Sequence, residues 1–274
     1  MTHEKTEKLQ KMLAELGYGS RREMEHWIGS GRIAVNGQPA HIGQRVTGKD
    51  RIRVDGKALH RRSNESSRVL VYNKPVGVIC SRRDPEGRRS VFDDLPKIRN
   101  GRWISVGRLD IQTTGLLLLS NDGALANRMM HPSTGLDREY AVRIIGKLSG
   151  EAIQRLLAGV EIDGELHRFN DVQYYNGSSI NHWYHVVLME GKNREVRRLF
   201  DAEGVTVSRL KRVRFGPVVL PSTLPRGRIA ELGHADLTSL YKLLRLPLIA
   251  RPNRRRENRR SLLLPYPELP NLKE

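Results

Sequence analysis

The sequence has little of several residue types on which common folds and chemistries depend. Only one of its 274 residues, Cys80, is a cysteine, which excludes an internal disulfide and a CxxC zinc site. No apolar run approaches the roughly 20 residues that cross a bilayer, and the charged start MTHEKTEKLQ lacks an apolar signal segment. We therefore expect a soluble, cytoplasmic, monomeric protein with no membrane association and no metal site.

Sequence signatures of bound nucleotide cofactors are also missing. There is no GxxxxGKS/T loop, and no GxGxxG follows a strand and opens a helix. His182 and His185 are spaced i, i+3 on an expected strand, where their side chains face opposite ways. Four Phe and three Trp are too few for a broad base-stacking platform. The sequence therefore carries no motif that indicates a nucleotide cofactor or a histidine metal site.

Acidic residues are scarce relative to basic ones. The chain has 30 Asp and Glu against 48 Lys and Arg, a net charge of +18. Residues 1–62 carry a net +6 and residues 245–274 a net +5, so about a third of the chain holds 11 of the 18 excess charges. A charge this strong indicates a polyanionic partner, with nucleic acid favoured over an anionic membrane.

The chain divides into a small and a larger unit. In residues 1–62 we expect two helices, at 5–16 and after an N-cap at Ser20, followed by short strands with an Asn36-Gly37 hairpin turn. We interpret residues 63–68 as a linker and residues 69–246 as the main domain. From 247 to 274 the chain becomes rich in Pro and Arg, which predicts a disordered basic tail.

The main domain mixes strands with inserted helices. Alternating apolar patterns indicate strands, and periodic patterns indicate helices at 123–130, 149–158 and 193–203. This order predicts an α+β fold with a largely antiparallel sheet.

One carboxylate has a position that raises a question of chemistry. Asp110, in WISVGRLDIQTTGLLLLSNDG, lies on the loop between two expected strands, next to Arg108. Loops between strands often carry catalytic residues. A single loop Asp is more often the cap of an Asx-turn. The residues alone leave both interpretations open.

Clusters of arginine provide candidate contacts to phosphate. Arg21 and Arg22 begin a helix, where positive charge is mildly unfavourable, and Arg32 extends the same unit. In EGKNREVRRLF, Arg194, Arg197 and Arg198 share one helical face, so they are expected to meet an anion, either RNA or a carboxylate of this chain. A solvated basic face explains the first cluster equally well, but in the second cluster it accounts for two of the arginines better than for all three.

These motifs together resemble a known family. GRLDIQTTGLLLLSNDG is similar to the signature of the pseudouridine synthases that modify single uridines of ribosomal RNA, and NKPVGVIC, REYAV and EGKNREVRRLF resemble its accompanying motifs. The first 60 residues resemble the RNA-binding module named after ribosomal protein S4. EKLQKMLAELGYGSRRE and DPEGRRSVFDDLPK are most similar to the large-subunit branch. The resemblance covers roughly residues 5–245.

The resemblance implies a role for each matching residue. Asp110 is the catalytic aspartate, Tyr140 packs on the target uracil, and Arg197 is the basic partner that keeps Asp110 ionised. Arg108 braces the gap left by the flipped nucleotide, and Lys74 lies near the site by motif position. The implied partner is large-subunit ribosomal RNA or a pre-ribosomal particle, with no cofactor. The alternative is a ribosome-assembly or RNA-chaperone protein that has lost catalysis.

Overall fold

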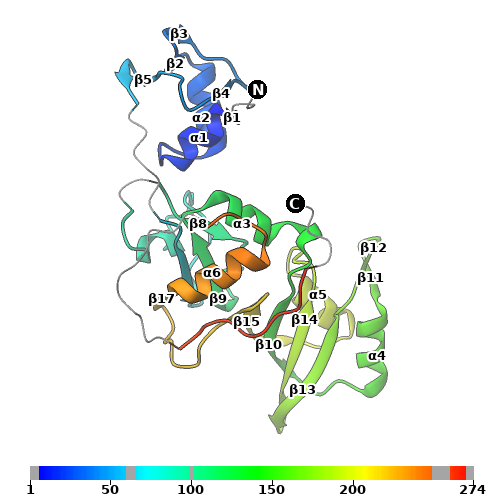
Figure 1. The fold of residues 1–274 in the computed structure, drawn as a ribbon. Coiled ribbons are helices and arrows are strands. Elements are labelled where there is room, and N and C mark those ends of the chain that lie inside the picture. The colour runs from blue at the N-terminus through cyan, green and yellow to red at the C-terminus, as the bar shows by residue number, and fades with distance from the viewer. Residues whose placement is uncertain (1–5, 60–65, 99–100, 249–259, 270–274) are drawn as a thin grey trace.

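The structure, a computed structural model of the 274-residue chain, describes residues 6–59, 66–98, 101–248 and 260–269. A small N-terminal module and a larger domain lie one above the other in Figure 1. An ion pair of 3.5 Å between Glu23 and Arg83 joins the two units. The expected α+β class is confirmed.

The small module begins with two helices that pack on each other, α1 (Leu9–Glu15) and α2 (Arg21–Gly29). The Ser20 hydroxyl accepts from the Glu23 amide and the Glu23 carboxylate accepts from the Ser20 amide, so the expected N-cap is confirmed as a full capping box. Leu9, Leu13 and Met24 are buried in the core between the helices and the strands.

Six short strands complete the module. β1 (Glu7–Lys8) pairs with β4 (Arg45–Val46), and a four-stranded sheet has the order β3-β2-β5-β6. Its strands are β2 (Ile33–Val35), β3 (Gln38–Pro39), β5 (Ile52–Val54) and β6 (Lys57–Ala58). Asn36 and Gly37 both have positive φ, 52° and 87°, as a tight hairpin between β2 and β3 requires.

The larger domain is built on one nine-stranded sheet with the order β13-β14-β10-β15-β9-β7-β17, in which β8 pairs with β9 and β16 with β15. All its strand pairs are antiparallel except β15 with β9. Its strands are β7 (Val69–Lys74), β8 (Ile104–Val106), β9 (Thr114–Ser120), β10 (Arg138–Ile145), β13 (Asp171–Ser178), β14 (Asn181–Leu188), β15 (Val207–Phe215), β16 (Val218–Val219) and β17 (Ile229–Glu231).

Helices cover different faces in the two halves of this sheet. On β9, Leu117 and Leu119 enter one core and Leu116 and Leu118 enter the other, which explains the uninterrupted GLLLLS run. The first core contains α4 (Gly150–Ala158) and α5 (Glu195–Ala202), and the second contains α3 (Gly123–Met130) and α6 (His234–Leu243). The remaining elements are two 3-10 turns, η1 (Val91–Asp94) and η2 (Pro132–Thr134), and the hairpin β11 (Val160–Ile162) and β12 (Glu165–His167).

The expectation of a disordered tail over 247–274 is wrong for residues 260–269, which we call the C-terminal segment. Leu263 forms a bridge with Val218, Leu269 is buried, and the Leu262 amide donates to Asp236 of α6. The leucines and Tyr266 of this segment supply the apolar surface that packs. The composition of residues 247–274 as a whole is dominated by the neighbouring arginines, so it did not predict this packing. The arginine-rich residues 251–259 lie outside the described residues.

The main domain also begins earlier in the chain than predicted. Ser67, placed in the expected 63–68 linker, is buried, and Arg68 forms a bidentate ion pair with Glu231 of β17. Residues 66–68 therefore belong to the sheet domain, since Ser66 and Arg68 are also hydrogen-bonded to Asn121, just after β9. Residues 60–65 lie outside the described part of the chain.

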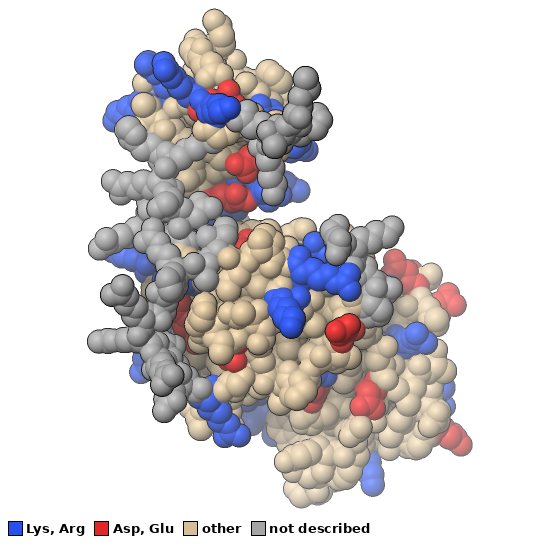
Figure 2. Space-filling view, viewed as in Figure 1, with Lys and Arg blue, Asp and Glu red and all other residues tan. Residues whose placement is uncertain are grey.

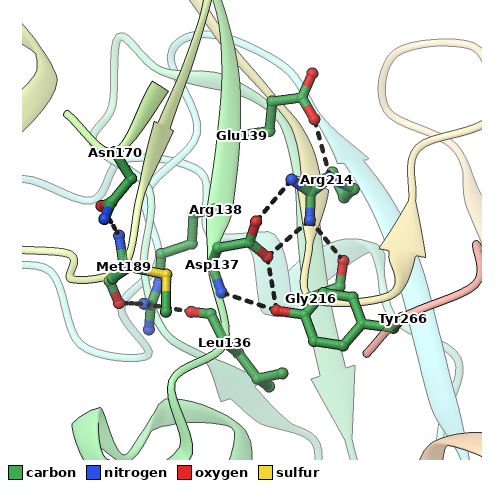
Figure 3. A network of polar contacts seen from close by, with 9 residues as sticks. All are labelled: Leu136, Asp137, Arg138, Glu139, Asn170, Met189, Arg214, Gly216 and Tyr266. Atoms are coloured by element: carbon green, nitrogen blue, oxygen red, sulfur yellow. Dashed lines mark hydrogen bonds and ion pairs between the residues drawn. The ribbon is translucent and has the colours of Figure 1, made fainter. Parts of the chain in front are cut away.

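A polar network attaches the C-terminal segment to the sheet (Figure 3). The Arg214 guanidinium donates two 2.7 Å hydrogen bonds to Asp137 and one of 2.9 Å to Glu139. The Tyr266 hydroxyl donates to the same Asp137 carboxylate at 2.8 Å. Burial, reinforced by that carboxylate, raises the pKa of Tyr266 to about 12, so its hydroxyl stays a donor at neutral pH.

Removing the Tyr266 hydroxyl tests whether this network attaches the C-terminal segment to the sheet. Tyr266→Phe removes the hydrogen bond to the Asp137 carboxylate and the acceptor of the Asp137 backbone amide. It is expected to lower the free energy of unfolding by about 2 kcal/mol, as for a hydrogen bond to a charged group. Chemical denaturation measures the change. Tyr175→Phe, at an exposed position, is the matched control and is expected to leave stability unaltered. Equal stability of both variants would contradict the assignment.

Candidate active site

The loop that carries Asp110, between β8 and β9, is fixed by a buried lysine. Lys74 is 0% exposed, and its ammonium donates to the carbonyls of Pro75, Asp110 and Thr113 at 3.0–3.1 Å. Burial lowers the pKa of Lys74. The three carbonyls use all three donors of the ammonium, so the contact fixes the backbone of the loop at residues 110 and 113.

The Asp110 side chain itself is not used by the fold. Among the described residues its carboxylate accepts no hydrogen bond and forms no ion pair within 4.0 Å, although the carboxylates of Asp84, Asp122 and Asp137 all accept several. The loop turns through backbone contacts instead, with the Thr113 amide donating to the Asp110 carbonyl at 3.0 Å. An Asx-turn therefore does not account for Asp110.

Asp110 lies on the wall of a cleft of about 780 Å³. The cleft is lined by the β8–β9 loop, the start of β10, the end of β15 and the segment from β14 to α5. Tyr140, Arg108 and Arg194, three residues singled out from the sequence, also line it. Tyr140 is largely buried in the cleft wall, whereas Arg108 and Arg194 are exposed at its surface.

The one parallel pairing of the sheet brings these residues together. Gly115, at the start of β9, pairs with Arg212 of β15, and Arg212 is opposite Tyr140 of β10. A Cβ on Gly115 would lie 2.2 Å from the Arg212 carbonyl oxygen, and φ is +100° there, so the close approach requires glycine. The loop that precedes β9 is thereby held beside Tyr140.

Arg197, on α5, is close enough to Asp110 to respond to its charge but does not contact it. It is 8% exposed, and its Nη1 donates to the Val207 carbonyl at 3.0 Å. Burial and the charge of Arg194 lower the pKa of Arg197, and the negative charge of Asp110 opposes this. No hydrogen bond from Arg197 to Asp110 is present among the described residues, so the expected partnership is not a direct contact here.

Two arginines in the cleft wall, one buried and one partly buried, were not predicted from the sequence. Arg212 is 3% exposed and donates to the Leu116 carbonyl, and Arg138 donates to the Leu136 and Met189 carbonyls. Both guanidinium groups lie about 5 Å from the Phe215 ring, at 5.2 and 4.8 Å. Burial lowers the pKa of Arg138. In the sequence they could have been recognised only as arginines within expected strands, at positions that face the inside of the domain.

Two of the predicted RNA-binding arginines are ion-paired within the protein. Arg32 forms a bidentate pair with Asp55 and lies 3.7 Å above the Trp27 ring, and Arg198 pairs with Asp163 of the β11–β12 turn. Arg21 and Arg22 are exposed in the first turn of α2. Figure 2 shows basic side chains gathered on the upper part of the small module.

Among the described residues, no group of three or more His, Cys, Asp and Glu side chains is arranged to hold a metal ion. None of the helices in that part of the chain is long and apolar enough to cross a membrane.

Comparisons with known proteins agree with this arrangement. Residues 68–202 match the family model of RNA pseudouridylate synthase, and residues 7–52 match the S4 domain. A crystal structure titled pseudouridylate synthase superposes with a TM-score of 0.60 at 26% identity, covering 85% of this chain and 99% of that one.

Curated relatives are more similar in sequence to this chain than that crystal structure is. The chain is 55% identical to ribosomal large subunit pseudouridine synthase B of Pseudomonas aeruginosa, over 90% of this chain and 64% of that protein. The enzymes of the same name from Vibrio cholerae and Escherichia coli K12 are 51% and 50% identical, over 88% of this chain and 76% and 84% of theirs. The chain thus spans less than two thirds of the Pseudomonas relative. It belongs to the family of ribosomal RNA pseudouridine synthases, which are isomerases, in the group that carries an N-terminal S4 domain.

Proposed function

We propose that this protein isomerises a uridine of large-subunit ribosomal RNA to pseudouridine, with Asp110 as the catalytic carboxylate. The observation that carries the proposal is a carboxylate that the fold does not use, on a loop whose backbone Lys74 binds, in a cleft that Tyr140 also lines. The names of the relatives favour the large-subunit RNA as substrate.

The reaction requires few kinds of group. The N1–C1′ bond of the uridine breaks, the uracil rotates, and a new bond forms between C5 and C1′. No atom is oxidised and no group is imported. Asp110 either attacks C1′ or removes the 2′ proton to give a glycal, and both routes require it to be ionised. Burial lowers the pKa of nearby Arg197 and the negative charge of Asp110 opposes this, so the guanidinium lies within electrostatic reach of this carboxylate.

The target base has to leave its stack to reach Asp110, at a cost of a few kcal/mol. The Tyr140 ring in the cleft wall offers a surface on which the flipped base packs. Arg108 and Arg194, exposed at the cleft, are placed to contact the phosphates beside it. Arg21 and Arg22 of the small module supply further phosphate contacts away from the reaction.

The alternative, a ribosome-assembly or RNA-chaperone protein without catalysis, fits the charge and the small module equally well. It gives no reason for an unpaired carboxylate beside a buried tyrosine. RNA containing 5-fluorouridine separates the two functions. A synthase converts it to an altered product or an adduct, whereas a pure binding protein returns it unchanged.

Substitution of Asp110 tests the catalytic role. Asp110→Asn keeps the shape and removes the charge, so product is expected to fall at least about a thousandfold while RNA affinity changes little. Pseudouridine mapping on protein-free large-subunit RNA measures the product. Asp201→Asn, which removes an exposed carboxylate of α5, is the control and is expected to retain full activity. An Asp110→Asn protein that works at the normal rate would refute the mechanism.

Substitution of Lys74 tests how the loop is held. Lys74→Met leaves three buried carbonyls without a donor and is expected to cost about 3 kcal/mol of folding stability. Because the loop then loses its position, the single-turnover rate is expected to fall more than tenfold at temperatures where the variant is still folded. Denaturation and rate are compared with Lys97→Met, at an exposed position. Normal activity of folded Lys74→Met would show that the loop does not need the lysine.

A further inference from the structure

One face of the sheet is left uncovered by the described helices. Along β10, β14 and β15, side chains such as Val142, Tyr184 and Leu210 point into the core that contains α4 and α5. The residues between them point to the opposite side. α3 and α6 pack on that side only over the other half of the sheet, against β7 and β9. Figure 1 shows α6 near β9 and β17, away from β13 and β14.

Basic and aromatic residues occupy this uncovered face. Arg143 of β10 is directly opposite Trp183 of β14 and Arg209 of β15. In the next row, Ala141 lies between His185 and Lys211. Side chains that are directly opposite share a face. We call Arg143, Tyr175, Trp183, His185, Arg209 and Lys211 the basic-aromatic face.

Three cations of the basic-aromatic face, Arg143, Arg209 and Lys211, form no ion pair with the described residues. Arg143 and Arg209 are a like-charged cross-strand pair, which is destabilising. The Arg143 guanidinium donates only to the neutral Ser208 hydroxyl, and Arg209 has no acidic partner among the described residues. Burial lowers the pKa of Lys211, and the positive charge of Arg226 lowers it further. An external anion is therefore the partner that these cations lack.

Two acids of the neighbouring strands β10 and β13 are already engaged by other partners. Glu139, two residues from Ala141 on β10, accepts from Arg214 and lies 2.6 Å from His185. Asp171 of β13 accepts from the Gln173 amide at 3.0 Å. Both acids lie toward the start of β10 and leave the Arg143 row without a counterion.

Aromatic rings beside the cations favour RNA over an acidic protein as the partner. Tyr175 is 69% exposed, and its ring centroid lies 5.4 Å from that of His185. Trp183 is partly exposed next to Arg143. Rings alternating with guanidinium groups stack unpaired bases while the cations contact their phosphates.

We propose that the basic-aromatic face is a second RNA-binding surface, which takes a single-stranded part of the substrate RNA outside the target loop. None of its six residues lines the cleft, so the surface is separate from the site of reaction. The choice of substrate RNA as ligand rests on the proposed function. The surface adds affinity and selects RNAs with an unpaired segment beside the target.

The test uses a fluorescently labelled oligoadenylate of 20 nucleotides, which has no uridine to react. Arg143→Gln/Arg209→Gln is expected to bind it about tenfold more weakly at 0.1 M salt, with the slope of log affinity against log salt reduced by about 1.4. The control pair Arg168→Gln/Lys242→Gln removes equal charge from other exposed positions and is expected to change affinity less than about twofold. Equal losses in the two pairs would overturn the proposal.

Two further measurements separate binding from folding and from catalysis. The Tm of Arg143→Gln/Arg209→Gln is expected to equal or exceed that of the wild type, because a like-charge repulsion is removed. A lower Tm would assign the pair a structural role and overturn the proposal. Trp183→Leu is expected to weaken oligoadenylate binding about fivefold even at 0.5 M salt, because stacking is not screened; undiminished binding would refute the stacking role.

The outcome for this surface is independent of the outcome for the reaction. At saturating large-subunit RNA the single-turnover rate of the double variant is expected to equal that of the wild type. If wild-type protein forms no pseudouridine, the proposed function fails while the oligoadenylate result still stands. If the wild type is active and the double variant binds oligoadenylate normally, only the second surface fails.

Discussion

The candidate site depends on one buried ammonium group. Lys74 is removed from water at the end of β7 and donates to three backbone carbonyls around Asp110. Desolvation of a cation is costly, and these hydrogen bonds offset the cost. Because the lysine determines the backbone of the loop, the Asp110 side chain is not required for the turn. Its carboxylate can therefore stay unpaired at the cleft, as a reacting group must.

The topology of the sheet supplies the second half of the site. The parallel contact between β15 and β9 places the loop of Asp110 beside Tyr140, and Gly115 allows the two backbones to approach. Arg197 approaches from α5 on the same side and contributes charge without contact. Residues that lie far apart in the sequence are thus brought together by strand pairing.

Local signals in the sequence predicted local structure well. Ser20 with Glu23 and Asn36 with Gly37 determine their own cap and turn, so no distant residue was needed to predict them. The α+β class followed from the order of periodic segments. The motif resemblance also identified Asp110 and Tyr140, which the structure brings to one cleft. The brace formed by Lys74 and the burial of Arg212 depend on contacts between distant strands, which no local pattern encodes. The packed C-terminal segment was missed because its apolar residues follow a run of arginines.

The most direct measurement of the central claim is a crystal structure of the protein with a large-subunit RNA hairpin that carries 5-fluorouridine at the target position. The account predicts a flipped nucleotide in the cleft, its base against Tyr140 and its C1′ or C2′ in contact with an Asp110 carboxylate oxygen. A hairpin bound with the target base still stacked, or with Asp110 turned away from the sugar, would contradict it.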